Sequence, residues 1–191
     1  MADTKKYDSK CAEMKENGYK KAEYILSTGY TYTMGLLIPL PLLLLNAVIY
    51  NIRWGNATEP LNDFNYIYLL IGTIVTTVIH EALHGLCWSF FCKDGFKSIK
   101  FGVSKGLPYC HCDEPMEKKG YAIGTLAPLA VLWGALLIVQ CIYTSSTIFL
   151  LTMINILSAG GDILIVLKMR GLRDVYIVDH PNLPGFTSFE K

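Results

Sequence analysis

Residues 66–92 read YIYLLIGTIVTTVIHEALHGLCWSFFC, and this stretch decides the fold. It is apolar throughout, except where His80, Glu81 and His84 interrupt it. At about 1.5 Å rise per residue, a helix of this length is long enough to cross a hydrocarbon layer about 30 Å thick. We therefore predict a membrane-spanning helix that carries ionisable residues inside it.

Three further stretches have the length and composition of membrane spans. They cover residues 31–51, 121–143 and 147–168, and the last is interrupted only by Asp162. The composition of the whole chain also indicates a membrane protein: 52% of its 191 residues are hydrophobic, 17% are charged and the mean hydropathy is +0.34. Such a chain buries its apolar surface in lipid rather than in one globular core. We predict an all-α transmembrane fold, a four-helix membrane bundle embedded in the lipid bilayer.

Lysine and arginine are distributed unevenly about these four spans. Of the 17 in the chain, all except Arg53 precede the first span, lie in the loop 93–120, or lie at or after the end of the fourth span. Four spans place those segments on one side, and the positive-inside rule makes that side cytosolic. We expect a multi-pass protein of the cell membrane with both termini cytosolic. Its parts are a cytosolic N-terminal segment 1–28, a membrane-embedded domain 29–170 and a cytosolic C-terminal tail 171–191.

The loop 93–120 has internal order of its own. Apolar residues alternate from Ser98 to Val103 and again from Leu107 to Cys112, on either side of Ser104-Lys105-Gly106. This pattern is typical of a β-hairpin. We predict a small cytosolic β-hairpin between helices 2 and 3 of the bundle.

Charge and cysteine content exclude some classes of partner and linkage. The net charge of +1 creates no global field for nucleic acid, and no basic patch is interleaved with aromatic residues. We therefore expect no nucleic-acid partner. The six cysteines lack the spacing of a disulfide framework, so we expect reduced thiols.

His80-Glu81-Ala82-Leu83-His84 has the HExxH pattern. Residues i and i+4 lie on one helix face, so both imidazoles can bind one Zn²⁺ while Glu81 flanks its water. Zinc lowers the pKa of that water to about 7, and a nearby carboxylate can then take its proton for hydrolysis. The alternative is a helix end that is merely wetted at the interface. Ionisable residues are costly in hydrocarbon and are by default functional there, which favours a metal site.

A catalytic zinc usually has three protein ligands, so a third is needed. Asp162 is the only acidic residue in the other three predicted spans. By helical rise it lies about 9 Å deep, comparable with the histidines, and Gly160 and Gly161 allow its helix to approach closely. The alternative is an Asp162 that only makes an interhelical hydrogen bond. Asn155, about two turns earlier, would either orient a substrate or ligand or bond to another helix.

The chain resembles a bacterial multi-pass membrane family of zincin peptidases, and it is more distantly similar to the site-2 proteases that cut within the membrane. The resemblance is carried by His80-Glu81-x-x-His84-Gly85, Ala127-Pro128, and Asn155 followed by Gly161-Asp162. In site-2 proteases the matching elements are a zinc-binding helix, an edge strand that pairs with substrate, and a distal Asp as third ligand. The site-2 pattern has a proline and a glycine near the places where this chain has Ser158 and Ile163.

The hairpin acquires a possible role from this resemblance. A free strand edge can add an extended polypeptide segment, which is what a peptidase must present to its water. His111, within Cys110-His111-Cys112, would then lie near the active site as a transition-state donor. Two alternatives stay open: a second metal bound by these three residues, or a solvated histidine.

The sequence thus predicts an integral membrane zinc-dependent endopeptidase that hydrolyses peptide bonds at or within the cytosolic half of the membrane. Its partner would be a polypeptide substrate associated with the membrane. The alternative is a non-proteolytic membrane zinc-binding protein, such as a sensor, transport subunit or scaffold. Glu81 discriminates between them, because metal binding alone does not require a carboxylate beside the first histidine. The substrate, the oligomeric state and the choice of zinc over another divalent ion are open at this stage.

Overall fold

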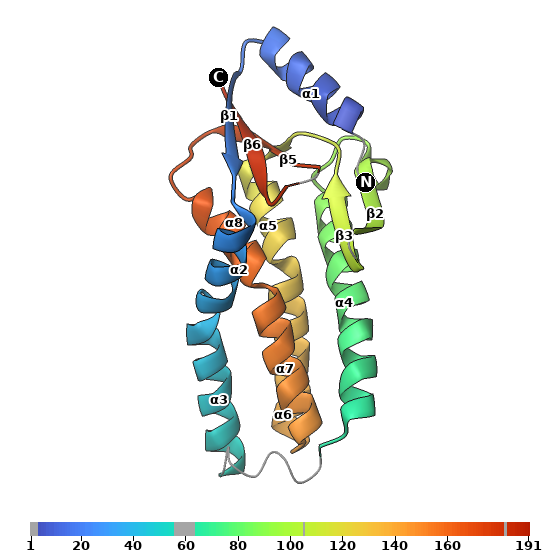
Figure 1. The fold of residues 1–191 in the computed structure, drawn as a ribbon, viewed down its shortest axis with the longest axis vertical. Coiled ribbons are helices and arrows are strands. Elements are labelled where there is room, and N and C mark those ends of the chain that lie inside the picture. Colours follow the sequence, from blue (N-terminus) through green and yellow to red (C-terminus); the bar gives the residue numbers. More distant parts are fainter. Residues whose placement is uncertain (1–3, 56–63, 105, 182) are drawn as a thin grey trace.

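Four helical columns run side by side, and a small sheet covers one end of them (Figure 1). The computed structural model describes residues 4–55, 64–104, 106–181 and 183–191. The four columns are long and apolar enough to cross a membrane, as the sequence predicts, and they comprise Thr28–Trp54, Tyr66–Ser89, Lys118–Ile142 and Ser146–Lys168. Large apolar side chains such as Leu70, Ile74 and Val78 are more than half exposed on their outer surface. This is the surface that lipid would cover.

Within the described residues, three of these columns are interrupted and one is continuous. The helices are α2 (Thr28–Leu37), α3 (Leu40–Trp54), α4 (Tyr66–Ser89), α5 (Lys118–Pro128), α6 (Gly134–Ile142), α7 (Ser146–Ser158) and α8 (Gly160–Lys168). Pro39 separates α2 from α3, because a proline has no N–H and its ring clashes with the preceding turn. Pro128 ends α5 and is followed by a π-helical turn, Leu129–Trp133. Ala159, with ψ of 0°, separates α7 from α8.

Helices α2 and α8 cross at two glycines. A Cβ atom on Gly160 would collide with the carbonyl oxygen of Gly35, so only glycine permits this approach of two backbones. The contact fixes the first turn of α8 against the bundle. Asp162 lies in that turn.

The predicted hairpin is present between the second and third columns. It consists of β2 (Ile99–Ser104) and β3 (Leu107–Cys112), paired antiparallel after a 3₁₀ turn (Gly95–Ser98). It packs on α4, because a Cβ on Gly85 would collide with the Phe101 ring and lie 2.8 Å from Ile99. The hairpin therefore lies beside the HExxH turns of α4, whereas its cytosolic location stays a prediction.

A second, four-stranded sheet was not predicted from the sequence. Its strands are β1 (Lys20–Ile25), β4 (Met116–Glu117), β5 (Val175–Asp179) and β6 (Gly185–Glu190), in the antiparallel order β1-β6-β5-β4. The segments 1–28 and 171–191, predicted as separate extensions, pair with each other through β1 and β6. Strands β5 and β6 are neighbours along the chain, but β1 and β4 are short and pair with segments far away in the sequence, so no local pattern indicates the whole sheet.

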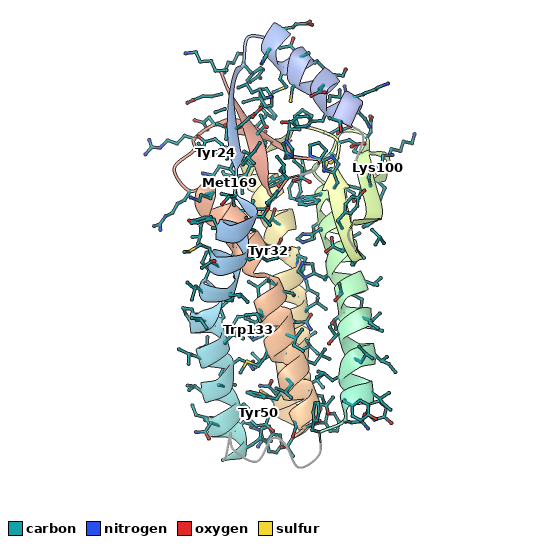
Figure 2. The ribbon with its side chains drawn as sticks, in the orientation of Figure 1. Tyr24, Tyr32, Tyr50, Lys100, Trp133 and Met169 are labelled. Carbon is teal, nitrogen blue, oxygen red and sulfur yellow. The ribbon has the colours of Figure 1, made fainter. Side chains whose placement is uncertain are left out.

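The sheet has a hydrophobic cluster on each face. Helix α1 (Thr4–Glu16) covers the outer face, where the buried residues are Tyr7, Cys11, Val178 and Phe189. The cluster between sheet and bundle consists of Trp88, Ile99, Cys112, Met116, Tyr121, Met169, Val175, Ile177 and Phe186. Figure 2 shows Met169 and Tyr24 at this end of the bundle and Tyr50 at the opposite end. The sheet is therefore docked on the bundle as a cap.

Candidate metal centre

Helices α4 and α8 bring three predicted ligands together. His80 and His84 lie one turn apart on one face of α4, and Asp162 is in the first turn of α8. Asp162 carboxylate oxygens lie 3.1 Å from His80 Nε2 and 3.5 Å from His84 Nε2, and the two Nε2 atoms are 3.2 Å apart. All three ligand atoms lie within 4.8 Å of one another. The third ligand predicted from the sequence thus lies where a shared ion would need it.

The chemistry of this donor set fits a zinc ion. Both histidines are buried, and Asp162 Oδ2 is a buried oxygen that receives no well-oriented hydrogen bond. Two imidazole nitrogens and a carboxylate that point at one spot leave lone pairs to be satisfied by protons or by a cation. Two histidines and one carboxylate are a ligand set of catalytic zinc sites.

The orientation of His84 is fixed through its other ring nitrogen. Nδ1 of His84 lies 2.9 Å from the carbonyl oxygen of Gly124 in α5. A carbonyl can only accept, so Nδ1 carries the proton and Nε2 keeps its lone pair for the metal. In an α-helix this carbonyl would bond to the N–H of the residue four positions later, but that residue is Pro128, which has none. Pro128 thereby leaves the Gly124 carbonyl available to His84.

An aromatic stack supports the same histidine. The Trp88 ring lies 5.1 Å from the His84 ring at 17°, and the Tyr121 ring stacks on Trp88 at 5.4 Å and 19°. Trp88 Nε1 donates to the Tyr121 carbonyl at 3.1 Å. A Cβ on Gly124 would collide with the Trp88 indole, so glycine is needed for the stack to form. Sequence reasoning missed these residues, although the Gly-x-x-x-Pro spacing of Gly124 and Pro128 is a usable signal.

Glu81 lies beside the three ligands. Its half-buried carboxylate is close enough to interact electrostatically with His80, His84 and Asp162, and it reaches the backbone of Cys110 in β3. Strand β3 therefore runs past the side of the site where Glu81 lies. A carboxylate in this position can accept a proton from a group that approaches the ligands.

Asn155 makes an interhelical hydrogen bond. Its Nδ2 donates to Thr76 Oγ1 at 3.1 Å and to the Leu151 carbonyl at 2.9 Å. Thr76 lies one turn before His80 on α4. Asn155 thus ties α7 to α4 beside the ligands, which corresponds to the second of the two roles considered for it.

His111 lies in a separate buried polar cluster. It is 3% exposed, and its ring nitrogens lie 2.8 Å from Asp179 and 3.3 Å from Asp113. Tyr121 donates to Asp179 at 2.9 Å, and Lys6 donates to Asp113 at 3.0 Å. Burial alone would lower the pKa of His111, but its hydrogen bond with Asp179 and the two carboxylate charges outweigh burial and raise that pKa.

No second metal centre forms around the Cys-His-Cys segment. Among the described residues, the only group of three or more histidine, cysteine or acidic side chains with convergent ligand atoms is His80, His84 and Asp162. The structure therefore places His111 with the carboxylates under the sheet and not with the candidate ligands.

The bundle and its convergent ligand set define a class: a helical protein suited to cross a membrane several times, with a candidate metal centre among its described residues. A family model described as "Putative zincin peptidase" matches residues 73–173, which is more than half of the chain. The chain belongs to this family, as the resemblance in the sequence predicts. Comparisons with curated proteins and with solved structures gave no match.

Proposed function

We propose that the chain is an integral membrane zinc-dependent endopeptidase that hydrolyses peptide bonds at or within the cytosolic half of the membrane. The observation that carries this proposal is the convergence of His80, His84 and Asp162, with Glu81 directly beside them. Membership of a zincin peptidase family and four apolar helices support it.

The residues divide the work as follows. His80, His84 and Asp162 hold the ion, which when bound supplies Lewis-acid polarisation and makes water acidic near neutral pH. Glu81 takes a proton from the attacking water and can return it to the leaving amine. The Gly124 carbonyl keeps His84 in the tautomer that binds metal.

The substrate in this proposal is an extended polypeptide associated with the membrane. Strand β3 runs past Glu81, and a strand edge binds extended backbone through main-chain hydrogen bonds. Asn155 and His111 are assigned the positioning of α7 and of the hairpin around this path rather than contact with the reacting bond.

A non-proteolytic metal-binding role is the second candidate. This role explains the three ligands equally well, but metal binding alone does not require the Glu81 carboxylate. Substitution of Glu81 therefore separates the two.

The test begins with metal content, measured by mass spectrometry on the detergent-purified chain. We expect about one zinc per chain, lost in His80→Ala, weakened in Asp162→Ala and retained in Glu81→Gln. Absence of metal in the wild type after zinc has been supplied would exclude the peptidase. Unchanged binding in Asp162→Ala would remove that ligand alone.

Activity is tested in proteoliposomes that contain the chain and a labelled, unfolded polypeptide with one hydrophobic segment. Removal of a general base lowers hydrolysis by about 10²–10⁴-fold, so Glu81→Gln should bind zinc but cleave slowly. Equal cleavage by wild type and Glu81→Gln, or none by either with zinc bound, would favour the non-proteolytic role.

A further inference from the structure

Two free thiols meet where the hairpin joins α4. Sγ of Cys92 lies 3.1 Å from Sγ of Cys112, and both cysteines are reduced in the structure. Cys92 follows the end of α4, and Cys112 is the last residue of β3. Two positions 20 residues apart along the chain thus present their thiols to each other.

The surroundings give the two thiols different reactivity. Cys92 is half-buried and more accessible than its neighbour, and its contact with the Cys112 thiol lowers its pKa. Cys112 is fully buried, and the Cys92 contact and burial together raise its pKa. Because the thiolate is the nucleophile, Cys92 is the thiol that an oxidant meets first and Cys112 is placed to resolve the product.

We propose that Cys92 and Cys112 are a reversible dithiol–disulfide pair, which in the oxidised state locks the hairpin to the end of α4. With glutathione disulfide as oxidant, the Cys92 thiolate attacks one of its sulfurs and releases one glutathione thiolate. Cys112 then loses its proton and attacks the mixed disulfide at the Cys92 sulfur, which releases the second glutathione. The two cysteine thiols are oxidised and one glutathione disulfide is reduced to two glutathione molecules.

The lock acts on the strand that borders the candidate metal centre. Glu81 reaches the backbone of Cys110, two residues before Cys112 on the same strand. Gly85 meets the hairpin directly through Phe101 and Ile99. A covalent bond at residue 112 therefore restrains the strand edge beside Glu81. The pairing of the thiols does not depend on whether the chain is a peptidase.

Cys110 is the natural competitor and supplies the control. Successive side chains of a strand alternate, so Cys110 and Cys112 project from the same face of β3. Within the described contacts, Cys92 approaches the Cys112 sulfur. If Cys112 is the partner of Cys92, the Cys92–Cys112 disulfide should still form in the Cys110→Ser variant.

The test is peptide mapping of the full chain in detergent. Reduced protein is treated with glutathione disulfide, free thiols are alkylated at acidic pH, and tryptic peptides are sequenced by tandem mass spectrometry, because one peptide carries both Cys87 and Cys92 and the other both Cys110 and Cys112. We expect a linked pair of peptides that contain Cys92 and Cys112, with the loss of two hydrogen atoms, in wild type and in Cys110→Ser. Cys92→Ser and Cys112→Ser should lack the link. Free thiols at saturating oxidant, or a link from Cys92 to Cys110 in the wild type, would overturn the proposal.

Amide hydrogen exchange shows whether the bond restrains the hairpin. Exchange in residues 99–112 should slow by on the order of tenfold or more in the oxidised wild type, since a cross-link restricts local opening. The same treatment should leave Cys92→Ser unchanged. Retained zinc and an unchanged thermal transition in that reduced variant confirm that it is folded, so equal exchange in oxidised and reduced wild type contradicts a lock.

Discussion

The orientation of His84 depends on a residue that does not contact it. Pro128 lacks the N–H that would otherwise engage the Gly124 carbonyl, and His84 Nδ1 uses that carbonyl instead at 2.9 Å. The same residue disturbs α5 enough that a π-helical turn follows it. A helix defect and a ligand tautomer are thus two results of one proline.

Pro128→Ala should separate metal affinity from stability. The new N–H can bond to the Gly124 carbonyl and compete with His84, so zinc affinity should fall about 10–100-fold. Helix propensity favours alanine by up to about 3 kcal/mol, so the thermal transition should stay or rise. Chelator competition and thermal unfolding measure the two effects. Pro39→Ala, at the α2–α3 break, is the control; unchanged affinity in Pro128→Ala would remove the link to His84.

His111 should make stability depend on pH. Asp179 from β5, Asp113 after β3, Tyr121 from α5 and Lys6 from α1 surround it, and His180 is close enough to interact with it electrostatically. Its pKa is raised above the usual 6.5, so its contribution is full below about pH 6.5. The contribution is lost as the pH rises through the folded-state pKa.

The measurement is the free energy of unfolding in detergent at pH 6 and at pH 8.5. Wild type should lose more stability over this interval than His111→Gln, which has no titrating ring. His180→Gln is a matched control. Burial lowers the pKa of His180, so removal of this ring should not reduce the loss of stability between pH 6 and pH 8.5. Parallel pH profiles for wild type and His111→Gln would show that the raised pKa does not stabilise the fold.

At the scale of elements, the position of Asp162 is set by how closely α8 approaches α2. The break at Ala159 lets α8 begin with Gly160, and Gly160 lies on the backbone of Gly35. Among the described residues, apart from its chain neighbours and the backbone of its own helix, no atom lies within 4 Å of where a Cβ on the neighbouring Gly161 would be. Two adjacent glycines therefore have different structural roles.

Gly160→Ala and Gly161→Ala form a matched pair. The first pushes a methyl group into a carbonyl oxygen, so α8 must move, with an expected loss of about 1–3 kcal/mol and weaker zinc binding. The second should be neutral or stabilising by up to about 1 kcal/mol, because alanine is the better helix former. Thermal unfolding and zinc titration compare them. Equal effects would mean that the α2–α8 contact does not position Asp162.

At the scale of the whole molecule, the hairpin, the sheet and α1 all lie at one end of the bundle (Figure 1). The C-terminal end of α3 and the N-terminal end of α4 lie at the other end. The lysine and arginine distribution predicts that the end with the sheet is cytosolic.

This orientation is tested by labelling single cysteines in a chain whose own cysteines are replaced by serine. Lys100→Cys, on the exposed face of β2, should react with a membrane-impermeant maleimide only after the cells are opened. Arg53→Cys, near the end of α3, should react in intact cells. The reverse pattern would invert the topology, and zinc binding by both variants shows that they are folded.

The features that the sequence predicted share a local signal. A long apolar run predicts each column. The spacing of four residues between His80 and His84, inside such a run, predicts that both are ligands. Asp162 was found because charge is rare in the spans. In each case the pattern is complete within a few turns of helix.

The features that the sequence did not predict depend on contacts between distant segments. Strand β1 reads as KKAEYI, a polar segment that no local rule distinguishes from a cytosolic tail. Its partner lies at residues 185–190. The sequence left His111 near the ligands, in a second metal site or in solvent. The structure surrounds it with Asp113 and Asp179, because the unpredicted strand β5 supplies the second of these. Strand pairing between distant segments therefore determines structure that local β-propensity does not predict.

The pairing of β1 with β6 also has a consequence for biosynthesis. Residues 20–25 leave the ribosome before any of the four apolar columns, and residues 185–190 leave after all of them. At about 5–20 residues per second, β1 waits roughly ten to thirty seconds for its partner. During that interval the nascent chain can insert its helices and gather the ligands, while α1 has no strand β6 to help it bury Tyr7. Closure of the cap is then the last step of assembly, and a ribosome that stalls after residue 168 leaves an uncapped bundle.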